Sequence, residues 1–400
     1  MNRCKFWTVA LIGILVPRVA VSADTAKEAL DKGTACLDKG DYDGVIAAFT
    51  EAIRLDPKSA ESYCYRGFAY FKKRDFDKAL ADCNEAIRLN PKLAEAYSVR
   101  GGVCGERGDW EKAIADCNEA ITLDPKCGKA YILRGAGLLQ KREFDRSITN
   151  YDEAIRLSPG SVEAFTIRGI AYSCKGEWDR AIIDFNEAIR LSPKYAKAYC
   201  MRGNAHKGRN DCDSAIADYT EAIRLKPDYA IAHCLRGIAY MHKGDTGKAV
   251  ADYSEAIRLN PIYAGAYCMR GIAYSEKGDV EKAVGDFTEA IRLNPRYADA
   301  YLNRAVAYHR KNDPDKAISD YNETIRLNPK RALIYYGRGQ IYGLKGDWER
   351  AIADFNEAIQ LDPKYAAAYY DRGRVYSKKG DKAKAEEDFA QAKKLGYKPP

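Results

Sequence analysis

Residues 264–297 read AGAYCMRGIAYSEKGDVEKAVGDFTEAIRLNPRY, and the same pattern occupies 230–263 before them and 298–331 after them. Tyr267 and Gly271 belong to columns that recur in most copies. One proline per copy keeps this spacing without a slip, at Pro57, Pro91, Pro125, Pro159, Pro193, Pro227, Pro261, Pro295, Pro329 and Pro363. A fixed period of this kind indicates that one supersecondary unit is repeated, and it decides the fold class before other residues are considered.

Two amphipathic helices are predicted in each copy. Tyr267, Gly271 and Tyr274 are spaced i, i+4 and i+7, so they lie on one face of a first helix. Val284 and Phe287 mark a similar apolar face in a second helix. Small residues such as Gly271 then face large ones such as Phe287, which allows two antiparallel helices to approach closely.

The turn between the two helices is predicted at Gly278 and Asp279. Glycine can take the left-handed conformation that ends one helix, and aspartate can cap the next. Asn210 and Asn312 replace the glycine in two other copies, and asparagine also tolerates a positive φ. Pro314 falls in the first turn of a second helix, where its missing N–H has no cost, so we expect it to leave that helix intact.

The repeated unit resembles the tetratricopeptide repeat. A lone unit could not bury both faces of its helices, so the units must stack. The resemblance covers eleven units, from 26–59 through 366–399, within a domain of residues 24–400. It implies an all-α fold, an α-solenoid in which antiparallel helix pairs stack into a right-handed superhelix. The chain departs from the family pattern by placing arginine where leucine is frequent before the glycine, and mostly tyrosine where tryptophan is frequent.

The arginine column shares a helix face with the tyrosines, so its charges are partly buried and need partners. An aspartate column recurs in the second helix, and there Asp286 follows Arg270. In the first unit both columns change together, to Lys32 and Ala48. This paired change predicts ion pairs inside a unit, of the type Arg270–Asp286, with a structural role.

Residues 1–23 are predicted to be a cleaved signal peptide. Arg3 and Lys5 precede an apolar run, Phe6–Val16, and Val21-Ser22-Ala23 resembles a signal-peptidase site. We therefore expect export to the periplasm or the exterior of a bacterial envelope. The alternative is an uncleaved membrane tether of an envelope assembly factor, although the apolar run is shorter than the roughly 20 residues that span a bilayer.

The charge balance argues against nucleic acid as a partner. The net charge is +8, and removing residues 1–23, which hold three basic residues and no acid, leaves +5. Basic residues form no run of five or more. We expect a protein or peptide partner, with membrane association only if the N-terminal segment is kept.

Twelve cysteines and four histidines raise the question of a disulfide framework, a metal site or an active centre. No C-x-x-C pair occurs, and the cysteines occupy columns that elsewhere hold core residues. We predict buried free thiols. The alternative is a disulfide between cysteines of different columns, such as Cys104–Cys117. His206 and His233 replace aromatic residues. We expect no metal, no cofactor and no catalysis; the alternative is an enzyme or metal-binding subunit that uses the cysteines and histidines of the middle repeats.

A second stripe on each first helix is the candidate binding surface. Across the eleven units its three columns contain only two residues with a formal charge, Lys207 and Arg374. Such a stripe either lines an apolar groove or is buried where neighbouring first helices touch. In the resembled family it faces the concave groove that holds a peptide or a partner helix. The predicted groove residues are Phe68, Phe71, Ile132, Leu139, Ile170, Cys200, Asn204, Lys207, Cys234, Ile238, Met241, Cys268, Ile272, Tyr336, Gln340, Tyr370 and Arg374.

Overall fold

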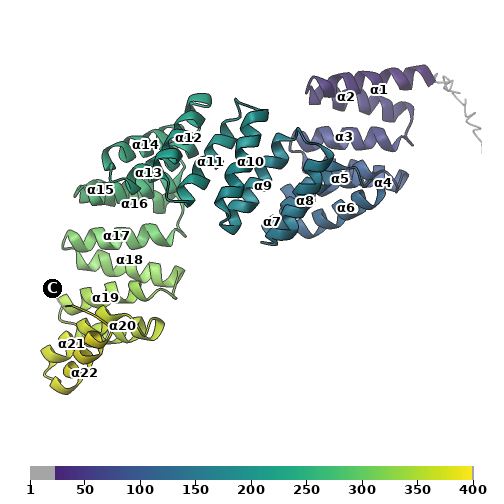
Figure 1. Cartoon of the computed structure of the whole chain (residues 1–400). Helices are drawn as coiled ribbons and strands as arrows, with labels where there is room; N and C mark the ends of the chain where they lie inside the picture. The colour runs from purple at the N-terminus through teal and green to yellow at the C-terminus, as the bar shows by residue number, and fades with distance from the viewer. Residues whose placement is uncertain (1–22, 399–400) are drawn as a thin grey trace, which may run out of the picture. The chain divides into compact units, whose positions relative to one another are not determined.

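A computed structural model of the chain describes residues 23–398, and these residues form 22 α-helices and no strand. Helices that follow one another in sequence pack side by side within each of two compact units, Met1–Lys175 and Gly176–Pro400 (Figure 1). The predicted all-α solenoid of stacked helix pairs is confirmed.

The N-terminal unit contains nine of the described helices. Their bounds are α1 Ala23–Asp38, α2 Tyr42–Leu55, α3 Ala60–Lys72, α4 Phe76–Leu89, α5 Ala94–Glu106, α6 Trp110–Leu123, α7 Gly128–Gln140, α8 Phe144–Leu157 and α9 Val162–Lys175. The first helix α5 also contacts the first helices α3 and α7 directly, so these three helices share one face of the unit.

The C-terminal unit contains the remaining described helices. Their bounds are α10 Trp178–Leu191, α11 Ala196–Gly208, α12 Cys212–Leu225, α13 Ala230–His242, α14 Thr246–Leu259, α15 Ala264–Glu276, α16 Val280–Leu293, α17 Ala298–Arg310, α18 Pro314–Leu327, α19 Ala332–Leu344, α20 Trp348–Leu361, α21 Ala366–Lys379 and α22 Lys382–Lys394. First helices from α11 to α21 contact the next first helix in the same way.

In many helix pairs a large side chain of the second helix faces a glycine of the first. Phe287 is buried in α16. A Cβ placed on Gly271 of α15 would lie 2.7 Å from Phe287 Cε1, a distance that real Cβ contacts essentially never show. Gly237 and Tyr253 repeat the arrangement, also at 2.7 Å. The ring opposite therefore limits this column to a small residue, as the sequence predicts, and the next copy of the column is the buried Ala305.

The turns adopt the predicted left-handed conformation. Gly278 has φ of +83°, and its replacements Asn210 and Asn312 have φ of +61° and +58°. Arg74 and Arg142 take the same conformation, at +64° and +62°, although arginine does not favour it. Both arginines occupy the glycine column, and their left-handed conformation is not predicted by residue type.

Aspartates cap most of the second helices. The Asp245 side chain accepts from the Lys248 backbone N–H at 3.1 Å, and Pro314 begins α18 behind the capping Asp313. The expectation for Asp279 is corrected: it stands at the N-cap position but its carboxylate makes no capping hydrogen bond, and it pairs with Lys282 Nζ at 3.0 Å.

The arginine and aspartate columns form the predicted ion pairs inside the repeats. Arg270 Nε and Nη2 donate to the two carboxylate oxygens of Asp286, each at 2.8 Å. Only 19% of the arginine side chain and 10% of the aspartate side chain are exposed. The same two-pronged pair joins Arg66–Asp82, Arg100–Asp116, Arg202–Asp218, Arg236–Asp252, Arg304–Asp320, Arg338–Asp354 and Arg372–Asp388.

The third guanidinium nitrogen reaches the preceding repeat. Arg270 Nη1 donates to Ser254 Oγ of α14 at 3.0 Å, and Arg100 Nη1 donates to Asn84 Oδ1 of α4 at 2.8 Å. Each such arginine therefore connects the second helices of two consecutive repeats. This contact between repeats was not predicted, since the accepting column varies among serine, threonine, asparagine and aspartate.

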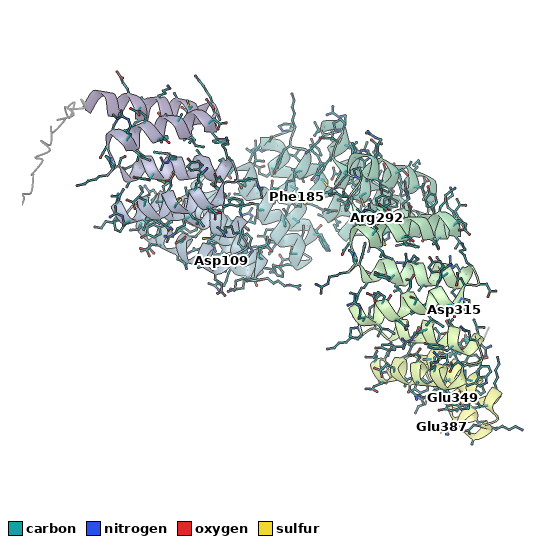
Figure 2. All side chains as sticks on the ribbon, turned by 180° about the vertical axis from the view of Figure 1, so that it is seen from behind. Asp109, Phe185, Arg292, Asp315, Glu349 and Glu387 are labelled. Carbon is teal, nitrogen blue, oxygen red and sulfur yellow. The ribbon has the colours of Figure 1, made fainter. Side chains whose placement is uncertain are left out.

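A second series of contacts between repeats lies on the surface. A basic residue at the end of a first helix pairs with an acidic residue in the first turn of the preceding second helix. Lys379 Nζ lies 2.7 Å from Glu349, and Lys345 pairs with Asp315; both acidic residues are labelled in Figure 2. One pair of this series is missing. Lys277 is the basic residue, but Gly247 of α14 occupies the position that is acidic in every other repeat except the last.

The predicted signal peptide, residues 1–23, lies outside the described residues except for Ala23. Within residues 23–398, no helix combines the length and the apolar character needed to cross a bilayer.

Candidate functional site

A groove of about 590 Å³ opens on the first helices α3, α5 and α7 of the N-terminal unit. The predicted residues Phe68, Phe71 and Ile132 line it. Val99 of α5 and Leu133 of α7 complete its apolar wall, and sequence reasoning missed both because they stand outside the three columns of the stripe. The groove is thus an apolar surface made by three consecutive first helices.

The hollow exists because α5 carries Gly102 in the column that holds Phe68 one repeat earlier. A Cβ on Gly102 would lie 3.5 Å from the Phe71 ring and 3.7 Å from Leu133 Cδ1, which is ordinary van der Waals contact. The next copy of the column is the small Ala136. Two small residues in succession leave room between the aromatic rings of α3 and the apolar side chains of α7.

The rim of the groove carries charges of both signs. Lys72 Nζ lies 5.1 Å from the centre of the Phe68 ring, and Lys129 Nζ lies 5.7 Å from the same centre. Both are cation–π distances. Glu95 and Glu106 of α5 lie on the same groove. A ligand of the groove therefore meets an aromatic platform flanked by cations, with carboxylates beside it.

Two further predicted residues of the N-terminal unit lie outside this groove. Leu139 of α7 packs, with Ile132, against the buried pair Ile148 and Tyr151. Ile170 of α9 is half-buried and does not line the groove.

The predicted groove cysteines Cys200, Cys234 and Cys268 do not line an open surface, and this prediction is corrected. All three are buried, with at most 3% of each residue exposed. Tyr229, which caps the start of α13, packs against the cluster of Cys200, and this cluster includes Ala232 and Ala239 of α13. Tyr263, which caps the start of α15, packs against the cluster of Cys234 in the same way. Consecutive repeats therefore bury this column between them.

Burial also makes these thiols unreactive at neutral pH. Desolvation raises the pKa of Cys200 and of Cys268 to about 11 and that of Cys117 to about 12. Every described cysteine is free, so the bridge between Cys104 and Cys117 is not formed. A buried thiol with a raised pKa holds little of the reactive thiolate at neutral pH.

The other predicted residues of the middle repeats are half-buried. Ile238 and Met241 pack against the cluster that contains Cys234, and Ile272 packs against the cluster of Phe287. Asn204 Oδ1 accepts the hydroxyl of the buried Tyr219 at 2.8 Å. Lys207 is also half-buried, in the last turn of α11. Both explanations of the stripe hold in part: in the middle repeats its first column is buried, and the other two columns are partly open.

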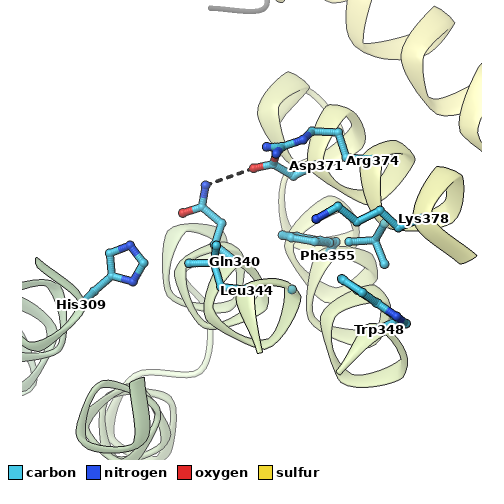
Figure 3. A pocket seen from close by; sticks show the side chains of 10 residues that line it. His309, Gln340, Leu344, Trp348, Phe355, Asp371, Arg374 and Lys378 are labelled. Atoms are coloured by element: carbon cyan, nitrogen blue, oxygen red, sulfur yellow. Dashed lines mark hydrogen bonds and ion pairs between the residues drawn. The ribbon is translucent and has the colours of Figure 1, made fainter. Parts of the chain in front are cut away.

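A smaller pocket, of about 160 Å³, lies in the C-terminal unit between α17, α19, α20 and α21. Figure 3 shows the predicted residues Gln340 and Arg374 on its wall, together with His309, Leu344 and Trp348. Sequence reasoning missed Leu344 and Lys378, which stand four residues after Gln340 and Arg374 and so extend the stripe by one helical turn.

The predicted groove residues Tyr336 and Tyr370 do not line this pocket, and their rings pack against other tyrosines. Tyr336 lies against Tyr365, with ring centres 4.8 Å apart, and Tyr370 lies 4.7 Å from Tyr397. The Tyr336 hydroxyl donates to Asp371 Oδ2 at 2.9 Å. Burial, and then the charge of Asp371, raise the pKa of Tyr336, so its hydroxyl keeps the donated proton.

Comparisons with known proteins agree with the repeat pattern. Models of families described as "TPR repeat" and "Tetratricopeptide repeat" match most of the chain. The matched ranges are 33–74, 174–209 and 340–380 for the first, and 60–93, 94–127, 200–264, 268–332 and 366–395 for the others. The chain belongs to the tetratricopeptide repeat family. Among curated proteins, a search finds no significant match.

Several solved structures are similar to this tetratricopeptide repeat chain. The crystal structure of MamA is 28% identical over 41% of this chain and 96% of its own, with a TM-score of 0.39. A tetratricopeptide repeat protein from Parabacteroides merdae is 20% identical over 62% of this chain and 99% of its own, with a TM-score of 0.49. Yeast Tom70 is 16% identical over 93% of this chain and 92% of its own, with a TM-score of 0.46.

The histidines of the middle tetratricopeptide repeats lie beside the ion-pair aspartates. His233 Nδ1 is 3.3 Å from Asp252 Oδ1, and His206 Nε2 is 3.8 Å from Asp218 Oδ2. Within residues 23–398, His, Cys, Asp and Glu side chains form no group of three or more arranged to hold a metal ion. The arrangement ties each of these two histidines to the interior of a repeat.

Proposed function

We propose that the chain is a non-enzymatic scaffold that binds a segment of a partner protein along the inner face of its first helices. The observation that carries this proposal is the apolar groove of about 590 Å³ on α3, α5 and α7. A hollow of similar volume, about 580 Å³, lies around Lys73 and Arg107, but its lining is mostly charged. The groove is therefore the better surface for an apolar side chain of a partner.

The chemistry of the groove indicates the kind of segment. Phe68, Phe71 and Ile132 offer apolar and aromatic surface, which is the type of surface that anchors a partner's side chain. Lys129 and Glu95 on the rim can each pair with a charge on the partner. We infer that the occupant is an amphipathic segment, helical or extended, with an apolar side chain for the hollow at Gly102 and charges of both signs beside it.

The site of action is proposed to be the bacterial envelope, either the periplasm or the exterior. This proposal depends on residues 1–23, whose basic start, apolar run and small-residue end are typical of a signal peptide. Mass spectrometry of the protein from its host would find Asp24 at the mature N-terminus. Retention of residues 1–23 would instead favour a membrane-tethered assembly factor.

Filling the groove tests the binding function. In a Gly102→Leu variant we expect the new side chain to fill the hollow, because a Cβ at this position meets the Phe71 ring and Leu133 at ordinary contact distances. Gly285→Leu is the matched control, since Gly285 is an exposed helical glycine with no atom within 4 Å of an added Cβ.

The partner for this test comes from site-specific photo-crosslinking in the host, with the crosslinker at position 71. The purified partner would then be titrated against both variants. We expect Gly102→Leu to weaken its binding at least about tenfold and Gly285→Leu to leave it unchanged. Equal affinities for the two variants would refute the groove as the binding surface.

A further inference from the structure

We infer that the pocket between α17, α19, α20 and α21 recognises an acidic side chain placed next to a large apolar side chain, inside a partner segment. This inference rests on the proposed function, because it assumes that the inner face binds protein segments. It concerns a different unit and a different chemistry from the groove on α3, α5 and α7.

The apolar half of the pocket is open to solvent. Leu344 is 75% exposed although it is a large hydrophobic residue, and it lies with Trp348 and Phe355 on the wall of the pocket (Figure 3). Gly343 adds a stretch of wall without a side chain. The leucine and the indole ring together form exposed apolar surface. Covering this surface with an apolar side chain of a partner favours binding.

Among the described residues that line the pocket, the one carboxylate is already occupied by groups of the chain itself. This carboxylate belongs to Asp371, which is 8% exposed. Its Oδ2 accepts from Tyr336 Oη at 2.9 Å and from Gln340 Nε2 at 3.0 Å, and its Oδ1 lies 3.1 Å from Arg374 Nη1. With three donors bound, the carboxylate of Asp371 is not free to bind a ligand cation.

The cations of the pocket are at its mouth. The Arg374 side chain is 57% exposed, and Lys378 follows it by one turn of α21. Lys378 Nζ lies 5.3 Å from the Trp348 ring, so the ammonium group sits directly beside the apolar wall. With Arg374, Lys378 and Asp371, the pocket has a net charge of +1. This charge favours a ligand that carries a carboxylate.

The neighbouring apolar wall narrows the class of ligand further. An isolated anion would use the cations and leave Leu344 and Trp348 uncovered, whereas an acidic residue adjacent to leucine or phenylalanine uses both. Two cations are too few for a nucleic acid backbone, which needs an extended basic surface. Because Arg374 and Lys378 lie one turn apart along α21, the rim fits a side-chain carboxylate of a segment that passes along this helix.

The probes for this inference are short peptides with acetylated and amidated ends in a glycine and serine background. One carries a central Leu-Glu pair, and its controls carry Leu-Gln, Leu-Lys or Ser-Glu. Each is titrated into the full chain labelled with ¹⁵N-tryptophan, and the indole N–H of Trp348 is followed by NMR. Trp110 and Trp178, which lie outside the pocket, are internal references.

We expect the Leu-Glu peptide to shift the Trp348 signal and to leave those of Trp110 and Trp178 in place. Lys378→Glu should weaken this binding at least about tenfold and favour the Leu-Lys peptide instead. Lys382→Glu, at an exposed position on α22, is the charge control. Leu344→Asp should abolish binding, whereas Leu333→Asp, also exposed on α19, should not.

Several results would overturn the inference. These are a Trp348 signal that no blocked peptide moves at millimolar concentration, equal affinities for wild type and Lys378→Glu, and binding that requires a free terminal carboxylate. Binding that is lost in Gly102→Leu and kept in Lys378→Glu would place the peptide in the groove on α3, α5 and α7. That outcome would refute the inference and leave the proposed function standing.

Discussion

Arg270 holds both carboxylate oxygens of Asp286 at 2.8 Å, across the two helices of one repeat. The remaining nitrogen of the same guanidinium reaches Ser254 in the repeat before. One side chain thus links the two helices of its own repeat and the repeat to its neighbour. The Tyr267 ring, 5.7 Å from the guanidinium carbon, covers part of the charge.

Removing the acid of this pair should destabilise the repeat. We expect Asp286→Ala to cost about 3 kcal/mol of unfolding free energy, because it leaves the largely buried Arg270 without a counter-charge. Hydrogen exchange of the α15 and α16 amides would measure the loss locally, which is preferable in a repeat array because such arrays do not unfold as a single two-state unit.

Asp286→Asn is the matched variant, and the chain already contains its equivalent. Arg134 Nε donates to Asn150 Oδ1 at 2.7 Å, and Asn150 Nδ2 donates to the Arg146 carbonyl. We expect the asparagine variant to lose less stability than the alanine variant. If both variants exchanged at the wild-type rate, a stabilising role for the pair would be excluded.

Gly271 and Gly285 should respond oppositely to the same substitution. Gly271→Ala brings a methyl group to 2.7 Å from the Phe287 ring, so we expect it to cost about 1–3 kcal/mol through overpacking. Gly285→Ala meets no atom within 4 Å and should stabilise α16 by roughly 0.5–1 kcal/mol through helix propensity.

Hydrogen exchange of the α15 and α16 amides in the two variants gives the comparison. The double variant Gly271→Ala with Phe287→Leu should recover part of the loss, since the smaller side chain makes room for the methyl group. A Gly271→Ala protein as stable as wild type would show that the ring moves away at no cost.

Restoring the missing acid at position 247 should add one surface contact between repeats. Gly247→Asp places a carboxylate in the first turn of α14, where Lys277 can pair with it and where the helix dipole favours a negative charge. We expect a gain of about 1 kcal/mol at low salt, part of it from replacing a helical glycine. Gly247→Asn separates the two effects, and thermal unfolding at low and at high salt measures them; a gain that salt does not reduce would contradict the ion pair.

Alkaline pH should destabilise the folded chain. Burial raises the pKa of Cys83 and Cys117 from 9.0 to about 12 and that of Cys200 to about 11. The unfolded chain therefore releases these protons at lower pH than the folded chain. The stabilisation is complete below pH 9 and is lost as pH rises toward 12.

Thermal midpoints measured between pH 8 and pH 11 would show this fall. In Cys117→Ala the fall should be smaller than in wild type, although the variant starts from a lower stability because it leaves a cavity. A wild-type midpoint that is constant over this range would refute the burial of the thiols in solution.

The fold was predictable because its signals repeat. The spacing from Pro57 to Pro363 sets the length of the unit, and the paired change to Lys32 and Ala48 identifies the Arg–Asp partners. The left-handed turns at Arg74 and Arg142 were not predictable from residue type. Backbone hydrogen bonds within each turn accompany that conformation, since the Arg74 N–H donates to the Phe71 carbonyl at 2.9 Å and the Arg142 N–H to the Leu139 carbonyl at 3.0 Å.

The candidate site was predictable only in part, because residue spacing identifies the face of a helix but not its distance from the next helix. Phe68, Gln340 and Arg374 line surfaces as expected. Cys234 stands in an equivalent column yet is buried, since Tyr263 and the alanines Ala266 and Ala273 of the following first helix pack around it. Leu344 and Lys378 lay one turn beyond the stripe, and extending the pattern by four residues would have found them.

The arginine that spans two repeats has a mechanical consequence. When tension is applied to the ends of either unit, a repeat that detaches must release its own Arg–Asp pair and the guanidinium contact to its neighbour in the same event. Adjacent repeats therefore share the load, and extension should proceed in jumps longer than the contour length of a single helix pair.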